Sequence, residues 1–113
     1  MHEMMKTAGV FLLVSAALHV VGAGLSGFAP IGQVLLLPAV LYLALYAGLA
    51  RGMLWVAWLT FLCMMGGMAG TILELAGPGP VPGWVLWGIL AADLGAAVAL
   101  FAAIWAGRPA ARA

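Results

Sequence analysis

The chain has 113 residues, of which 67% are hydrophobic and only 6% are charged, and its mean hydropathy is +1.24. A soluble domain carries about a quarter charged residues, and without them it would expose apolar patches and aggregate. The composition therefore predicts an integral membrane protein with no separate soluble domain, and a net charge of +1 excludes a nucleic-acid-binding surface.

Four apolar stretches are long enough to cross a bilayer as helices. A transmembrane helix needs about 20 mostly apolar residues to span roughly 30 Å of hydrocarbon. Among the connections, residues 77–83 contain three prolines and three glycines and cannot continue a helix. The predicted helices cover residues 8–27, 31–50, 53–76 and 84–106. Because the connections are short, we expect one membrane domain over residues 1–113, an all-α, up-down bundle of four transmembrane helices.

Basic residues predict how this bundle is oriented. They all fall at the N-terminus, the second connection or the C-terminus, on one side of a four-helix arrangement: Lys6, Arg51, Arg108 and Arg112. Under the positive-inside rule, the N and C termini are then cytoplasmic. Tryptophans near both ends of the spans are typical of aromatic belts at the membrane interfaces. The Ala-, Gly- and Leu-rich composition favours a multi-pass protein of a bacterial inner membrane.

The first span has a competing interpretation as a cleaved signal peptide, because Lys6 precedes an apolar run and small residues. Glu3 in the charged region and His19 within the apolar core argue against it. Cleavage would also leave an odd number of helices and break the charge pattern. We therefore expect the first span to be part of the bundle.

Three ionisable residues fall within the predicted spans: His19, Glu74 and Asp93. Such groups are costly in hydrocarbon and need a partner or a function. Counting about 1.5 Å per residue, His19 and Asp93 both lie near the midplane, whereas Glu74 lies at the outer interface. If the first and fourth helices are neighbours, His19 and Asp93 can meet. Three interpretations stay open: a proton-titrating pair, a polar contact between two helices, or an Asp93 that faces a partner subunit.

Polar and small residues recur at helical spacing in two spans. One face of the first helix carries Ser15, His19, Gly22 and Ser26. One face of the third helix carries Thr60, Cys63, Gly67, Thr71 and Glu74. Tyr42 lies on the second helix near the midplane, at a depth similar to that of His19. These faces are expected to point inward, where they either pack helices together or line a narrow hydrated path.

Small residues also form two faces that let another helix approach closely. One lies in the third span at Gly66 and Gly70, and the other in the fourth span at Gly88, Ala92, Gly95, Ala96 and Ala99. A bundle of only four helices cannot bury every helix face. These faces are therefore candidates for contacts with another chain.

The sequence predicts no metal or cofactor site. Cys63, Met64 and Met68 bring together soft sulfur ligands that suit Cu(I), but methionine is also an ordinary filler of apolar cores. A haem held by two histidines would need two chains, since His19 is the only histidine within a span. The single cysteine cannot form an intrachain disulfide.

The sequence contains no catalytic constellation, so we expect a protein without enzymatic activity. The leading hypothesis is an accessory subunit or homo-oligomer that acts through helix–helix association, with the lipid bilayer and other membrane subunits as partners. An alternative hypothesis is a small proton-coupled carrier or channel that uses His19 and Asp93, with Glu74 at its outer mouth. A third is a quinone or haem contact built from His19, Tyr42 and Asp93.

Overall fold

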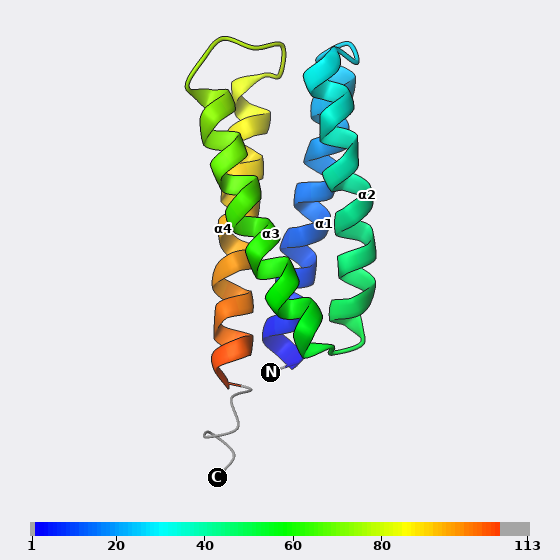
Figure 1. The fold of residues 1–113 in the computed structure, drawn as a ribbon, viewed down its shortest axis with the longest axis vertical. Helices are drawn as coiled ribbons and strands as arrows, with labels where there is room; N and C mark the ends of the chain where they lie inside the picture. Colours follow the sequence, from blue (N-terminus) through cyan, green and yellow to red (C-terminus); the bar gives the residue numbers. More distant parts are fainter. Residues whose placement is uncertain (1, 107–113) are drawn as a thin grey trace.

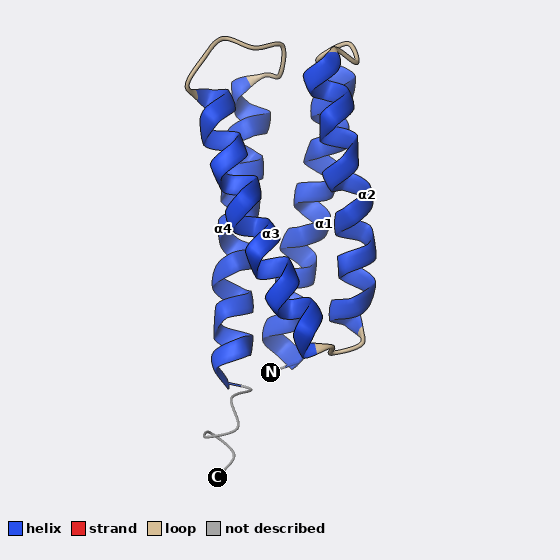
Figure 2. Ribbon diagram, viewed as in Figure 1, coloured by secondary structure: helices blue, strands red, loops and turns tan. Residues whose placement is uncertain are grey.

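A computed structural model describes residues 2–106 as four α-helices joined by short loops (Figures 1 and 2). They are α1 (His2–Leu25), α2 (Pro30–Ala50), α3 (Leu54–Leu75) and α4 (Gly83–Ala106). All four are long and apolar enough to cross a membrane, which confirms the four predicted helices and suggests a multi-pass membrane protein. The largest difference from the prediction is at the start of α1, which begins at His2 rather than at residue 8. The apolar pattern marks the hydrocarbon, whereas the helix continues through polar residues.

The turns at the helix ends follow from local chemistry. After α1, Gly27 and Phe28 both adopt positive φ angles, of 70° and 57°, and the Phe28 N–H donates to the carbonyl of Ala23. This left-handed turn closes the helix, and Pro30 starts α2 because its fixed φ suits the first helical position. Gly52, with φ of 72°, makes the equivalent reversal between α2 and α3.

The four helices alternate in direction, and the bundle has two unlike halves (Figure 1). We call the end with residue 2, the α2–α3 loop and residue 106 the lower half, and the end with the other two loops the upper half. Helix α1 packs against α2 and α4, and α3 packs against α4. Helices α2 and α3 meet closely at the lower end, where Gly48 lies against the side chain of Val56. Towards the upper end the two helices diverge.

The larger apolar core fills the lower half. Its fully buried members include Met5, Leu12, Leu49, Met64 and Leu100. Small residues on α4 bring α1 close: a Cβ at Gly95 would lie 2.8 Å from the Phe11 ring. The upper half has a smaller cluster, centred on Val81, Val85, Leu86 and Ile89.

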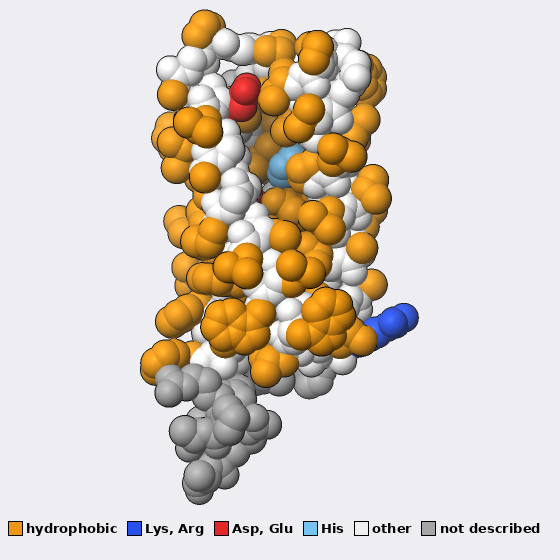
Figure 3. All heavy atoms as spheres, in the orientation of Figure 1, with side chains coloured by type: hydrophobic (Ala, Val, Ile, Leu, Met, Phe, Trp, Pro, Cys, Tyr) orange, Lys and Arg blue, Asp and Glu red, His pale blue; other side chains and the backbone are white. Residues whose placement is uncertain are grey.

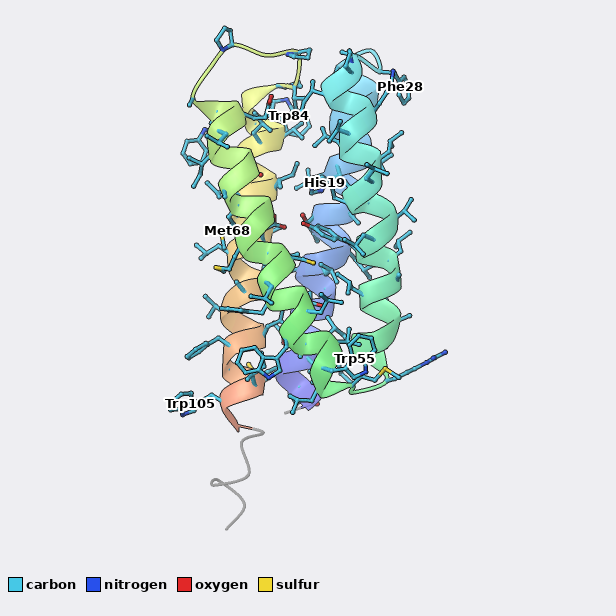
Figure 4. All side chains as sticks on the ribbon, in the orientation of Figure 1. His19, Phe28, Trp55, Met68, Trp84 and Trp105 are labelled. Atoms are coloured by element: carbon cyan, nitrogen blue, oxygen red, sulfur yellow. The ribbon has the colours of Figure 1, made fainter. Side chains whose placement is uncertain are left out.

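Apolar side chains cover much of the surface, and several polar side chains are buried between the helices (Figure 3). Leu37, Leu62, Leu73 and Val98 are each more than 60% exposed, whereas Ser15, Thr60 and Asp93 are fully buried. Large contiguous apolar surfaces are unstable in water but suit a lipid environment. Figure 4 places Trp55 and Trp105 near the lower end and Trp84 near the upper end, as expected for aromatic side chains at two interfaces.

Candidate functional site: a cleft between α2 and α3

A cleft of about 350 Å³ opens between α2 and α3 in the upper half. Its walls are His19, Ile31, Pro38, Leu41, Tyr42, Cys63, Gly66, Gly67, Gly70 and Thr71. Figure 3 shows a hollow at this place, with a histidine side chain visible inside it. The cleft exists because α2 and α3 diverge and because three of the α3 wall residues are glycines. A Cβ at Gly66 or Gly70 would meet nothing within 4 Å.

His19 extends from α1 into this cleft (Figure 4) and is held in one orientation. Its Nδ1 lies 2.6 Å from the backbone carbonyl oxygen of Ser15. A carbonyl oxygen can only accept, so Nδ1 carries the hydrogen and donates it, and in the neutral ring Nε2 is left as an acceptor. The ring also stands edge-to-face against Tyr42, with centroids 5.3 Å apart.

Asp93 is fully buried on α4 beside the cleft. One carboxylate oxygen, Oδ1, accepts a hydrogen bond of 2.6 Å from the Ser15 hydroxyl. The other oxygen, Oδ2, has no hydrogen-bond partner among residues 2–106. An unpaired buried acceptor is costly, so such a group needs an explanation.

Ser15 is the residue that brings His19 and Asp93 together. Its carbonyl oxygen accepts from His19 and its hydroxyl donates to Asp93. The helical spacing of four residues places Ser15 directly below His19 on the face of α1 that meets α4. Within the described part of the chain, the two ionisable side chains are linked through Ser15 rather than by a direct ion pair.

Gly67 of α3 separates Asp93 from the cleft. A Cβ at this position would lie 2.7 Å from Asp93 Oδ2 and 2.9 Å from the Tyr42 hydroxyl oxygen. Both oxygens thus occupy the space that a side chain would fill. The absence of a side chain at Gly67 lets α2, α3 and α4 come together here. We call the place where the Asp93 carboxylate and the Tyr42 hydroxyl lie against Gly67 the polar point.

The remaining polar candidates lie apart from this point. Glu74 is partly exposed on the last turn of α3 and does not line the cleft. Thr60 and Thr71 donate to carbonyl oxygens of their own helix, at Val56 and Gly67. Of the predicted face on α3, only the part from Cys63 to Thr71 reaches the cleft.

The two small-residue faces have different places. Gly88 and Gly95 pack against Leu18 and Phe11 of α1, and the alanines between and beyond them, Ala92, Ala96 and Ala99, are buried inside the chain. Gly66 and Gly70 border the open cleft. The sequence alone did not identify Ser15 or Gly67 as central, although both belong to the predicted polar faces. The signal for Ser15 was its position one turn before His19.

Among residues 2–106, the structure contains no group of three or more His, Cys, Asp or Glu side chains that could hold a metal ion. The fold and the site thus define an all-helical, four-helix chain with an apolar surface and a cleft that contains a buried histidine. Searches against protein-family models, curated proteins and solved structures found no match to this chain.

Proposed function

We propose that the chain is a four-pass protein of a bacterial inner membrane, with both termini in the cytoplasm. Lys6 and Arg51 lie at the lower end, and the two loops at the upper end contain no Lys or Arg. Arg108 and Arg112 add to the same charge bias but lie outside the described residues. In this orientation the upper half, which contains the cleft, is the outer half of the bundle.

This topology is testable with single cysteines in a Cys63→Ala background. A membrane-impermeant maleimide added to intact cells is expected to label Pro80→Cys, in the upper loop, and to leave Met53→Cys, in the lower loop, unlabelled until the cells are broken. Labelling of Met53→Cys alone in intact cells would show the inverted orientation.

Within the membrane, we propose that the protein is a small proton-coupled carrier without enzymatic activity. The observation that carries this proposal is the unpaired, fully buried oxygen of Asp93 behind the cleft wall. A charged Asp at the centre of a membrane helix costs about 2.5–3.5 kcal/mol or more, and such groups commonly belong to proton or ion pathways. The apolar core of the lower half supports a carrier over an open channel, because the cleft beside Asp93 lies in the upper half and does not include the residues of that core other than Tyr42 and Cys63.

The groups around Asp93 suit proton exchange. Ser15 of α1 donates to it, and the Tyr42 hydroxyl of α2 lies beside the same glycine as its Oδ2. His19 is joined to it through Ser15, and among the described residues no Lys or Arg lies on the cleft. Protonation of Asp93 therefore changes the net charge beside the cleft by one. In the proposal, this change in charge alters the affinity of the cleft for a solute, and the bound solute in turn alters the proton affinity of Asp93.

The test is proton uptake into liposomes that contain the purified protein and an internal pH-sensitive dye. The assay contains no added solute and therefore measures the proton movement of the carrier by itself. We expect uptake down an imposed pH gradient by the unchanged protein and loss to the level of empty liposomes with Asp93→Asn. Thr60→Val, a change at a buried hydroxyl away from the cleft, is the matched control and should retain uptake. If Asp93→Asn and His19→Ala both kept uptake, the mechanism would be wrong.

A second candidate function is that of an accessory subunit or homo-oligomer. The open space above Gly66 and Gly70 favours it, because small residues one turn apart let a helix of another chain approach closely. Native mass spectrometry after extraction in a mild detergent separates the two proposals. Co-purifying polypeptides would support the accessory subunit, whereas a stable monomer that binds nothing would contradict it.

A further inference from the structure

The chemistry of the cleft also limits what it can bind. Most of its wall is apolar, including Ile31, Pro38 and Leu41, and two of its polar side chains, His19 and Tyr42, lie side by side. Along α2, the rise from Tyr42 to Ile31 is about 16 Å. A volume of about 350 Å³ is at the small end of the range of small-molecule sites and is far below what a whole helix needs. A small molecule with an apolar body fits these dimensions.

Two hydrogen-bonding groups on the cleft wall, one on His19 and one on Tyr42, have no partner within the described residues. His19 Nε2 is an acceptor, because Nδ1 donates to Ser15. The Tyr42 hydroxyl forms no hydrogen bond in this part of the chain, and its ring touches that of His19. Unlike Asp93 Oδ2, neither of these atoms is sealed from the cleft. The cleft thus offers one acceptor and one hydroxyl side by side.

We propose that the cleft binds a neutral, largely apolar molecule with a single hydroxyl head, an alcohol or a phenol. The head donates its hydrogen to His19 Nε2 and accepts one from the Tyr42 hydroxyl, while the body lies against Leu41 and Ile31. This ligand class names the solute of the proposed carrier and so rests on that proposal. An ammonium head suits the site less well, because Asp93 Oδ2 is enclosed behind Gly67.

The ligand reaches the site from the bilayer. The cleft opens sideways between α2 and α3, where Leu41 is 45% exposed on the apolar surface. An apolar body therefore passes from lipid into the cleft without crossing water. Most of the discrimination then comes from the head group, since a donor that pairs with a buried acceptor is selected over an analogue without one.

The experiment compares 4-octylphenol with 4-octylanisole, which has the same body but a methylated oxygen. The protein is labelled with ¹⁵N-histidine and embedded in lipid nanodiscs, and the ring nitrogen signals are recorded by NMR. His2→Gln identifies the His19 signals by removing the only other histidine. We expect the Nε2 signal to move in a saturable way with 4-octylphenol and to stay in place with 4-octylanisole.

Two variants test the geometry of this site. Gly66→Leu fills open space on the cleft wall and should abolish the shift. Tyr42→Phe removes one hydrogen bond and should weaken binding about three- to tenfold. Equal shifts with both probes, no shift with 4-octylphenol, or stronger binding of octylammonium would each overturn the proposal. The liposome assay contains no phenol, so failure of binding and failure of proton uptake are observed separately.

Discussion

The two halves of the bundle are built from the same kinds of residue but differ in how closely α2 and α3 approach each other. In the lower half, α2 and α3 meet at Gly48 and Val56, and large side chains such as Leu100 and Met64 are fully enclosed. In the upper half the same helices diverge and leave a cleft with His19 inside it. We infer that the lower half stabilises the fold, and that this stability allows an open and partly unsatisfied polar site above it.

Glycines allow close helix packing in the lower half and leave open space beside α3 in the upper half. Gly48 brings two helix backbones together, since a Cβ there would lie 2.7 Å from a Val56 methyl group. Gly66 and Gly70 face empty space instead. A glycine in a membrane helix therefore marks either a close contact or an opening, and only the arrangement of the neighbouring helices distinguishes them.

The largest expected effect on stability is in the lower core. Leu100→Ala removes an enclosed side chain and should lower the free energy of unfolding by about 2–4 kcal/mol, because a cavity remains. Val98→Ala, two residues away on the exposed face of α4, should change it by less than about 0.5 kcal/mol. Unfolding in detergent micelles with increasing SDS measures both. Equal losses would contradict the assignment of a stabilising core to this half.

A smaller but sharper contrast is expected between adjacent glycines of α3. Gly67→Ala places a methyl group against Asp93 Oδ2 and the Tyr42 hydroxyl and should cost about 1–3 kcal/mol of stability. Gly66→Ala meets open space and should be neutral or stabilising by up to about 1 kcal/mol, because alanine favours the helix. The same SDS titration checks the pair. A neutral Gly67→Ala would show that the polar point does not depend on close packing.

The hydrogen bond between Ser15 and Asp93 should contribute about 0.5–1.7 kcal/mol, the range seen for such bonds between membrane helices. A double-mutant cycle of Ser15→Ala and Asp93→Ala measures this coupling energy, because each single change removes one partner of the hydrogen bond. The single change Ser15→Ala leaves Oδ1 without its donor and is expected to cost more than the coupling alone. A coupling energy of zero would mean that the two side chains do not interact in the folded protein.

The sequence predicted the elements of this fold well because span length and hydropathy decide them locally. Each apolar stretch became a helix, and the proline- and glycine-rich segment at 77–83 became a loop with the start of α4 at its end. The similar depth of His19 and Asp93 followed from counting residues, and the structure brings both to Ser15.

The unequal divergence of the helices could not be predicted from the sequence. Helical phase shows which residues share a face, but it does not specify the helix that the face meets. The faces at Gly66 and Gly88 looked equivalent for that reason, although Gly88 is covered by Leu18 of α1 and Gly66 is open. The role of Gly67 depends on three helices converging, which is a property of their packing.

The smallest expected effect concerns the two threonines of α3, one in each half. Thr60 and Thr71 both donate to a carbonyl oxygen one turn earlier in their own helix. That carbonyl also accepts its ordinary helical hydrogen bond, and valine has nearly the same shape as threonine. Thr60→Val and Thr71→Val should therefore each change the free energy of unfolding by less than about 0.5 kcal/mol.

The two threonine variants test whether the side-chain hydroxyls of α3 contribute differently to stability in the two halves. If Thr60→Val cost more than about 1 kcal/mol, the lower half would depend on a polar interaction, and its description as an apolar core would fail. If both changes are neutral, the hydroxyls are incidental to the two halves. The difference between the halves then rests on the Ser15, His19 and Asp93 group, because that group alone joins buried polar atoms of different helices through hydrogen bonds within residues 2–106.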